Sequence, residues 1–551
     1  MARAADVLVE TLRRHKVDRA FCVPGESYLA LIDSLYDAGD IDMVTTRHEG
    51  GAALMAVADA KITGRAGIAM CSRGPGATNA SIGIHVAQQD AVPLVLFIGQ
   101  VARADIGRGA FQEVDYEDFF GGMAKMVTEV TDAEQLPEVV RRAFHTASTG
   151  TPGPVVISLP EDMLLDDTAA PALDPSPVDV PSPTAEDIKE ICERLAAAKR
   201  PLLIAGGQIG GAQGRRALKA VSEAWQLPVA VAWRRQDLFD NTHPHFVAHL
   251  GFNMPPVFKE RLNEADLVVA IGTRLGDVTT QGYEIPTAPD PKQPLVHVYV
   301  DSEHIGRIFS TDVGLTADAT ASLEAIAQVN APPAADGRAE WIAHLRTLHA
   351  ERMKWDRPEA DDGVPFGNII AGLSDVLGDD AILINDAGNF ATWLHRLFPF
   401  RDSHLFLGAT AGAMGFGVPA AVAAGLRAPE RQVACLVGDG GFQMTGNELT
   451  VAVERQLPVR IFVANNQSLG TIRLYQEKNY PGRVANTVLP EVDFSAWARA
   501  FGAAGLKIDS QADVAPVLAQ ALETPGPVLV DVKTSLEYLA AYVRMSDLKP
   551  S

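Results

Sequence analysis

Two polar residues, Asp439 and Asn466, each follow a short apolar segment that has the composition of a buried strand. The first segment spans 433–437, the second spans 459–464, and the sequence predicts a helix between them at about 444–456. This spacing is typical of one βαβ crossover, which places two parallel strands close together. Because open α/β sheets hold ligands at the carboxyl ends of their strands, we expect Asp439 and Asn466 to share a ligand site.

A metal–diphosphate complex suits these residues. A hard cation such as Mg²⁺ takes oxygen ligands, which a carboxylate, a side-chain amide and a backbone carbonyl provide, and it shares them with phosphates. Gly438, Gly440 and Gly441 surround Asp439, and their lack of side chains lets backbone N–H groups approach a diphosphate. A tight turn followed by a loop would also explain these residues. The Gly-Asp-Gly sequence alone is therefore weak evidence, and the βαβ spacing between Asp439 and Asn466 is what favours the ligand site.

A carboxylate near the N-terminus occupies a similar junction. Glu49 lies where a predicted strand, 42–46, passes through Arg47 and His48 into a predicted helix, 51–62. By itself, Glu49 is an acidic residue at a helix N-terminus, where the helix dipole stabilises a negative charge.

The elements around these residues alternate between strands and helices along most of the chain. Apolar segments at 68–71, 94–98 and 155–159 are typical of buried strands, and alanine-rich segments lie between them. A proline-rich stretch at 166–183 predicts a linker, 330–337 is a weaker break, and 340–360 is expected to be a helical connector. We therefore expect an α/β protein with three doubly wound parallel-sheet domains. Their predicted bounds are 1–165, 184–330 and 360–540.

Composition excludes several classes of protein. The net charge is -22, from 47 basic and 69 acidic residues, which argues against a nucleic-acid partner. We see no apolar run long enough to span a membrane, and the first residues indicate an amphipathic helix and no signal peptide. The four cysteines form no Cys-x-x-Cys pair, which indicates buried reduced thiols. A cytoplasmic enzyme without membrane partners is the expectation.

Several segments together resemble one enzyme family. Arg47-His48-Glu49 begins the segment RHEGGAALMA, 72–79 reads SRGPGATN, 99–103 reads GQVAR, 111–113 reads FQE, and 412–417 reads GAMGFG. With the Gly-Asp-Gly and Asn-Asn segments, they resemble the thiamine-diphosphate-dependent enzymes of the acetolactate synthase-like family. The similarity extends along most of the chain and is densest in 1–165 and 385–475.

The resemblance implies the cofactors thiamine diphosphate and Mg²⁺ and a role for particular residues. Glu49 would activate the cofactor through its aminopyrimidine, and Phe111 and Gln112 would be catalytic as well. Asp439, Asn466 and the carbonyl of Ser468 would bind the metal. The domains would be pyrimidine-binding, central and diphosphate-binding, in chain order. The residues expected at the cofactor are Pro24, Glu49, Gly388, Asn389, Gly412, Met414, Gly438, Asp439, Gly440, Gly441, Asn466, Ser468, Leu469 and Gly470.

The resemblance also implies an activity and an assembly. The expected reaction is carboligation or decarboxylation of pyruvate or another 2-oxo acid, with 2-oxo acids or aldehydes as substrates. In this family the activating glutamate and the metal site come from different subunits, so a homodimer or homotetramer is implied. The sequence does not say whether a regulatory subunit is used.

The predicted substrate pocket departs from the family pattern. Thr471 and Tyr475 stand where biosynthetic acetolactate synthases usually carry methionine and tryptophan, and Ala102, Glu26 and Phe390 replace proline, glycine and histidine. A nonoxidative 2-oxo acid decarboxylase is therefore an alternative interpretation.

An FAD-linked enzyme of the pyruvate-oxidase type is the other alternative. The turn at 208–211, the segment 272–274 and Asp301 resemble the FAD-binding region of family members, whereas Gly276 and Val278 replace polar residues of that region. The sequence therefore leaves FAD open as a further cofactor but favours it less.

Overall fold

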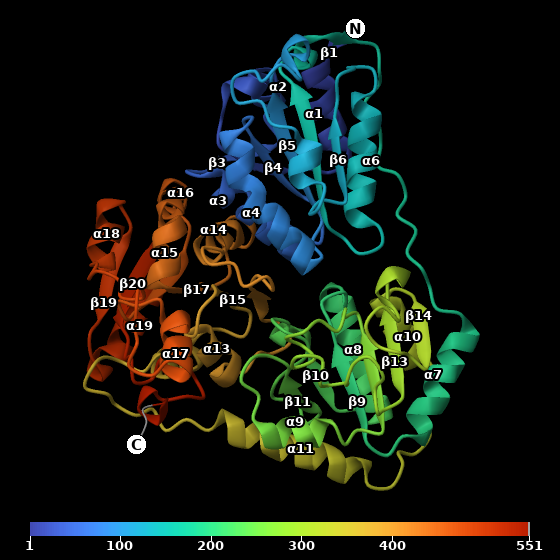
Figure 1. Ribbon diagram of the computed structural model, residues 1–551, viewed down its shortest axis with the longest axis vertical. Helices are drawn as coiled ribbons and strands as arrows, with labels where there is room; N and C mark the ends of the chain where they lie inside the picture. The colour runs from blue at the N-terminus through green and yellow to red at the C-terminus, as the bar shows by residue number, and fades with distance from the viewer. Residues whose placement is uncertain (549–551) are drawn as a thin grey trace.

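Three six-stranded sheets, all of them parallel, form the centre of the molecule in the computed structural model, which describes residues 1–548 (Figure 1). Helices pack on both faces of each sheet, and separate apolar clusters lie on the two faces. The prediction of an α/β protein with three doubly wound parallel sheets is confirmed.

The N-terminal sheet has the strand order β3-β2-β4-β5-β7-β6. Its strands are β2 (Arg19–Cys22), β3 (Asp42–Thr45), β4 (Gly67–Cys71), β5 (Leu94–Gln100), β6 (Met126–Glu129) and β7 (Pro154–Pro160). Its helices are α1 (Ala4–Arg14), α2 (Leu29–Ala38), α3 (Glu49–Thr63), α4 (Pro75–Asp90), α5 (Tyr116–Phe120) and α6 (Leu136–Ser148). One apolar cluster joins α1, α2 and α6 to one face, and another joins α3 and α4 to the other.

The middle sheet has the order β11-β10-β9-β12-β13-β14. Its strands are β9 (Pro201–Ala205), β10 (Val229–Val231), β11 (Phe246–His249), β12 (Leu267–Ile271), β13 (Leu295–Tyr299) and β14 (Val313–Thr316). Its helices are α7 (Ala185–Ala197), α8 (Gly211–Trp225), α9 (Pro256–Leu262) and α10 (Ala319–Ala327), followed by the connecting helix α11 (Arg338–Met353). The expected linker before α7 contains only the short strand β8 (Asp167–Thr168), which pairs with β1 (Ala2–Arg3).

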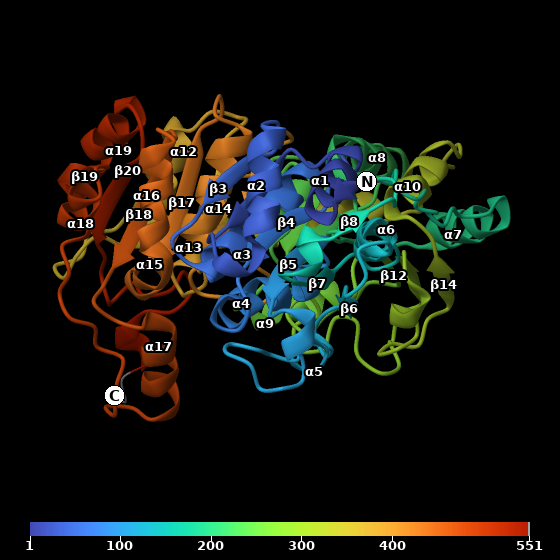
Figure 2. The same ribbon diagram turned by 90° about the horizontal axis from the view of Figure 1, so that it is seen from above.

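The C-terminal sheet has the order β16-β15-β17-β18-β20-β19. Its strands are β15 (Ile382–Asn385), β16 (Leu405–Leu407), β17 (Val433–Gly438), β18 (Val459–Asn465), β19 (Ala504–Ile508) and β20 (Val528–Lys533). Its helices are α12 (Phe366–Val376), α13 (Ala391–Leu397), α14 (Gly417–Arg427), α15 (Asp439–Thr445), α16 (Leu449–Glu454), α17 (Gly470–Asn479), α18 (Phe494–Ala500) and α19 (Val514–Glu523). Figure 2 shows α17 and the loop before α5 projecting from the same side of the molecule.

The crossover after β17 confirms one expectation and corrects another. Strands β17 and β18 are parallel neighbours, as the spacing predicted. The single helix predicted at 444–456 is wrong, because α15 already begins at Asp439 and a 3₁₀ turn at Gly446–Glu448 separates it from α16. Glycine and asparagine, at 446 and 447, have low helix propensity, which explains the break.

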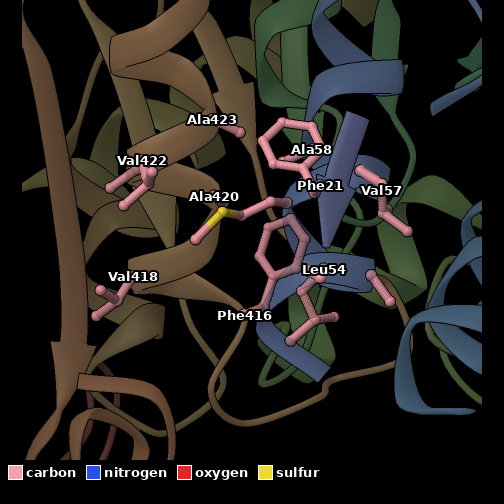
Figure 3. Packing of buried hydrophobic residues seen from close by; sticks show 14 of the residues in the cluster. Phe21, Leu54, Val57, Ala58, Phe416, Val418, Ala420, Val422 and Ala423 are labelled. Carbon is pink, nitrogen blue, oxygen red and sulfur yellow. The ribbon is translucent and has the colours of Figure 1, made fainter. Parts of the chain in front are cut away.

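The N- and C-terminal sheets share one apolar core through α3 and α14. Both helices are rich in alanine and glycine, and α3 is buried on all sides along most of its length. Figure 3 shows Ala420 and Ala423 of α14 facing α3, while Val418 and Val422 point to the opposite side. The two domains of one chain are therefore joined by helices that cover the faces of their sheets.

Within residues 1–548, no helix has both the length and the apolar character that crossing a bilayer requires.

Candidate active site

A cavity of about 790 Å³ lies at the carboxyl end of the C-terminal sheet. The strand order of this sheet reverses between β15 and β17, and the loops that follow these two strands form part of the wall. This is the switch point at which open α/β sheets bind ligands. The predicted residues that line the cavity are Gly388, Asn389, Gly412, Met414, Gly438, Asp439, Gly440, Gly441, Asn466, Ser468, Leu469 and Gly470.

Asp439 connects the loops that follow β17 and β18. Its Oδ1 accepts a hydrogen bond from the Gly440 N–H at 2.8 Å, and its Oδ2 accepts bonds from the N–H groups of Asn466 and Ser468, each at 3.2 Å. Burial raises the pKa of Asp439 to about 6, although these N–H donors act in the opposite direction. The carboxylate is thus fixed beside the cavity by backbone groups alone.

The side-chain oxygen of Asn466 provides a test for a bound cation. Asn466 Oδ1 is buried and has no hydrogen-bond partner among residues 1–548, although a buried carbonyl oxygen normally has one. Asp439 and Asn466 thus present a carboxylate and a free amide oxygen to one cavity, and such oxygens suit Mg²⁺. Within the described chain, no group of three or more His, Cys, Asp or Glu side chains could hold a metal, so any metal here would also need amide or backbone oxygens. The residues present fit a hard cation.

Gly440 packs against the loop after β18. A Cβ at this position would lie 2.7 Å from Leu469 Cδ2, so a side chain there would require the leucine side chain to shift. Asn389, on the loop after β15, donates from Nδ2 to the Gly470 carbonyl at 3.3 Å. The three loops that follow β15, β17 and β18 therefore touch one another around the cavity.

The loop that carries Met414 is held by a carboxylate that the sequence analysis missed. Asp386 is fully buried and accepts hydrogen bonds from the N–H groups of Gly415 and Gly417, each at 3.0 Å. Gly412 and Gly415 have φ of 68° and 85°, which is the left-handed region that favours glycine. Burial raises the pKa of Asp386 to about 6. Its position directly after a buried strand, like that of Asp439, was a signal that could have identified it.

Glu49 lies on the other sheet. It is the first residue of α3, and its Oε2 accepts a hydrogen bond from Asn79 Nδ2 at 2.9 Å. A Cβ at position 76 would lie 3.3 Å from Glu49 Oε1, so glycine there leaves space beside this oxygen. Glu49 does not line the cavity described above.

A second carboxylate missed by the sequence analysis lies beside Glu49. Glu448 is fully buried, and both of its carboxylate oxygens accept a hydrogen bond from the backbone N–H of Arg47, each at 3.1 Å. Burial raises the pKa of Glu448 to about 7, and the nearby charge of Glu49 acts in the same direction. Because 401 residues separate Arg47 from Glu448, no local pattern in the sequence could indicate this contact.

The remaining predicted residues lie with Glu49 at the carboxyl end of the N-terminal sheet. Phe111 is 77% exposed, and Gln112 has a φ of 66°. The Gln112 carbonyl packs so closely against Gly74 that a Cβ there would lie 2.5 Å from it. Pro24 follows β2 and is exposed. Like Glu49, these three residues do not line the cavity, so one chain brings twelve predicted residues together and leaves four apart.

The middle domain contributes a wall that the sequence did not predict. Trp233 and Phe252 line the cavity and contact each other edge-to-face, with ring centroids 5.1 Å apart. Asp277 and Val278 line the same wall. Arg234 is buried and donates to the carbonyl oxygens of Asn385 and Asp386, each at 3.2 Å, which fixes the wall to the C-terminal sheet.

Comparisons with known proteins agree with this arrangement. Three family models of thiamine pyrophosphate enzymes match the chain: the N-terminal TPP binding domain over residues 2–119, the central domain over 188–326, and the C-terminal TPP binding domain over 386–532.

Curated relatives match nearly the whole chain. The chain is 32% identical to the acetolactate synthase large subunit of Corynebacterium glutamicum over 540 residues, which are 96% of this chain and 86% of the relative. It is 32% identical to the acetolactate synthase isozyme 3 large subunit of Escherichia coli over 95% of this chain and 92% of the relative. Identity to the acetolactate synthase large subunit of Lactococcus lactis is 30%, over 96% and 92%. The chain belongs to the thiamine-diphosphate-dependent enzymes of the acetolactate synthase-like family, as its sequence motifs predicted.

Proposed function

We propose that the protein is a thiamine-diphosphate- and Mg²⁺-dependent carboligase that acts on pyruvate or another 2-oxo acid. The observation that carries the proposal is the cavity at the C-terminal sheet, where the Asp439 carboxylate lies among glycine-rich loops with Asn466 Oδ1, which has no partner within residues 1–548. The names of the relatives support ligation of 2-oxo acids.

Each loop of the cavity has a role in this proposal. Asp439, Asn466 and the Ser468 carbonyl would bind Mg²⁺ together with the diphosphate. The loops would hold the rest of the cofactor, whose thiazolium supplies an electron sink for breaking and forming carbon–carbon bonds beside a carbonyl. Met414, on the loop fixed by Asp386, would support the cofactor, and the Gly412 carbonyl would accept a hydrogen bond from the cofactor's amino group. The loop residues assigned to the diphosphate end are Gly388, Asn389, Gly438, Gly440, Gly441, Leu469 and Gly470.

Glu49 is proposed to hold a proton at the pyrimidine ring of the cofactor. Asn79 holds its Oε2, which leaves Oε1 to face a ligand in the space beside Gly76. Phe111, Gln112 and Pro24 lie on the same sheet edge and would complete this half of the site. Residues 1–165 would therefore form the pyrimidine-binding domain, 184–330 the central domain and 360–540 the diphosphate-binding domain.

The active unit is proposed to be a homodimer, alone or paired into a homotetramer. Within one chain, Glu49 lies beside Asn79 and Glu448, away from the cavity that contains Asp439. A second copy would bring Glu49 of the partner subunit to that cavity, which explains why the predicted residues form two groups. We further propose a cytoplasmic location and small 2-oxo acids or aldehydes as the substrates.

FAD receives less support as a further cofactor. At the carboxyl end of the middle sheet, the N–H groups of Gly206 and Gln208 already donate to the carbonyls of Ile271 and Gly272 at 2.9 and 3.0 Å. A Cβ on Gly207 would lie 2.4 Å from Arg235 Nε, so this turn is filled by a side chain. Because these two N–H groups are already paired, they are not free to bind a phosphate, which argues against an FAD-linked oxidase.

A nonoxidative 2-oxo acid decarboxylase is the second candidate. Thr471 and Tyr475, which differ from the residues usual in biosynthetic synthases, line the cavity. An altered acceptor pocket would leave the donor half of the reaction intact and weaken ligation.

The experiment is incubation of the protein with thiamine diphosphate, Mg²⁺ and pyruvate, followed by proton NMR of the products. The Glu49→Gln variant should lose turnover but keep its thermal stabilisation by the cofactor, and Glu10→Gln, which changes a 46% exposed side chain of α1, serves as the control. Acetolactate formed by the wild type supports the carboligase, and acetaldehyde alone supports the decarboxylase. Turnover of another 2-oxo acid in place of pyruvate would change only the donor. Absence of both cofactor binding and turnover would contradict the proposal.

A further inference from the structure

A second cavity, of about 230 Å³, lies between the N-terminal domain, the proline-rich linker and the end of α14. Asp59 and Thr63, near the end of α3, line it, and so does Arg427, the last residue of α14. Glu49 is the first residue of α3, about 20 Å away along the helix. This cavity is therefore separate from the proposed active site.

Cationic side chains predominate in this cavity, although the chain as a whole has a net charge of -22. Its two carboxylates, Asp18 and Asp59, are both bound by Arg427, with distances from 2.5 to 2.9 Å. Arg65 donates to Asp18 as well, at 2.9 Å. The negative charges are thus already neutralised inside the cavity. The cationic residues of the lining are Lys16, Arg19, Arg65, Arg141 and Arg427.

Two of these cations have no acidic partner. Neither Lys16 nor Arg141 forms an ion pair within 4.0 Å among residues 1–548. Arg19 uses Nε to bind Asp42 at 3.0 Å, and its Nη1 is left free. A ligand in the cavity would therefore meet positive charge on Lys16 and Arg141 that no ion pair among residues 1–548 compensates.

Three buried nitrogen atoms of the lining residues also have no hydrogen-bond partner in the described part of the chain. They are Arg19 Nη1, His15 Nε2 and His145 Nδ1. A buried polar atom without a partner costs roughly 1–3 kcal/mol, so three such nitrogens in residues of one lining leave this region of the fold short of acceptors. The arginine nitrogen is a donor. His15 Nδ1 contacts the Thr11 carbonyl at 2.8 Å, so its Nε2 is a donor only when the ring is protonated, which burial disfavours by lowering the pKa of His15.

We propose that this cavity is a binding site for the phosphate group of a small phosphorylated metabolite. A phosphate dianion offers several acceptor oxygens and matches more than one uncompensated cation, whereas a single carboxylate would leave some of the donors unused. The volume of about 230 Å³ limits the ligand to a small molecule. The bound phosphate would contact the far ends of α3 and α14, whose first turns adjoin Glu49 and the Met414 loop.

The test uses the protein saturated with thiamine diphosphate and Mg²⁺, so that the diphosphate loops are occupied, and inorganic phosphate as the probe. Thermal unfolding is followed as phosphate replaces chloride at constant ionic strength. The unfolding temperature should rise along a saturable curve, because a ligand that binds the folded state stabilises it by mass action. Acetate at the same ionic strength should give a much smaller rise.

The matched variants localise the effect. Arg141→Gln should weaken phosphate binding about tenfold or more, because a hydrogen bond to a charged group is lost. Arg142→Gln changes the neighbouring exposed residue of α6, which does not line the cavity, and should bind phosphate like the wild type. An equal loss in both variants, a linear response to phosphate, or an equal response to acetate would overturn the proposal. The readout is binding, so it stays informative even if the protein fails to turn over pyruvate.

Discussion

The N-terminal and C-terminal sheets have the same architecture but differ in what their carboxyl ends face. In each sheet a carboxylate begins a helix just after a strand, Glu49 after β3 and Asp439 after β17. Asp439 lines a large cavity, whereas Glu49 lies beside Asn79 and the buried Glu448. The reason is that the two domains of one chain pack through α3 and α14, not through the ends of their strands. Under the proposed function these are two half-sites, and one chain does not bring Glu49 to the cavity that Asp439 lines.

Subunit complementation gives the largest expected effect. Glu49→Gln and Asp439→Asn should each reduce turnover by at least about 100-fold, since each removes a group from one half-site. In a mixed dimer of the two variants, one site would contain both substitutions and the other would be intact, because a two-fold dimer has two equivalent sites. Random mixing at equal amounts should then restore about a quarter of the wild-type turnover.

This experiment needs an inert variant of the same type. Asp379→Asn changes an exposed aspartate of the C-terminal domain that pairs with Arg401, and its turnover should equal that of the wild type. If refolded or co-expressed mixtures of Glu49→Gln and Asp439→Asn stay inactive while still forming dimers, both halves of the site come from the same chain, contrary to the comparison.

The contact between the two domains of one chain predicts the next largest effect. Lys61 of α3 is buried, pairs with Asp90 at 2.5 Å and donates to the Gly408 carbonyl at 2.7 Å. Burial lowers the pKa of Lys61 to about 8. Lys61→Met would leave Asp90 in the interior without its ammonium partner, which should cost about 3–5 kcal/mol of unfolding free energy.

Chemical denaturation of the variant measures this loss. Lys259→Met removes an exposed pair with Glu284 and should change stability by less than about 1 kcal/mol. Equal stability of the Lys61 and Lys259 variants would show that the contact between the N- and C-terminal domains does not depend on the Lys61–Asp90 ion pair.

Glu448 predicts a change of stability with pH. Its folded pKa of about 7 lies above the ordinary 4.5, so the folded state keeps a proton that the unfolded state has released between these values. Stability should therefore fall as the pH rises from 4.5 to 7, by roughly 3 kcal/mol in total. Glu448→Gln removes this titration, and its unfolding temperature relative to the wild type should increase between pH 5 and pH 8.

A neighbouring glutamate gives the control for this pH profile. Glu454 also contacts Arg47, at 2.8 Å, but it is 54% exposed, so Glu454→Gln should follow the wild type at both pH values. A Glu448→Gln profile parallel to that of the wild type would mean that Glu448 is ionised in the folded protein throughout this range.

The two regions also differ in how much the sequence could predict. Asp439 and Asn466 were predicted because each follows a local apolar strand pattern, and a parallel crossover then sets their distance. Asp386 also directly follows an apolar strand segment. It was not predicted, because no second polar residue lies at a spacing that matches the one between Asp439 and Asn466. Trp233 and Glu448 could not be predicted, because they act through contacts between domains that are far apart in the sequence, and local periodicity does not record such contacts.

The middle-domain wall predicts the smallest effect and tests whether it belongs to the substrate side of the cavity. Phe252 is 52% exposed and rests edge-to-face on Trp233, and such pairs contribute about 0.5–1.5 kcal/mol. If this face contacts substrate, Phe252→Ala should raise KM about two- to tenfold and leave kcat nearly unchanged, since the lost binding energy would be equal in ground and transition states. Tyr283, which packs on Phe309 in the same domain and does not line the cavity, gives the matched control Tyr283→Ala. A lower kcat with constant KM in the Phe252 variant would instead place the wall next to the reacting atoms, and the middle domain would then have to be counted as a third part of the active site.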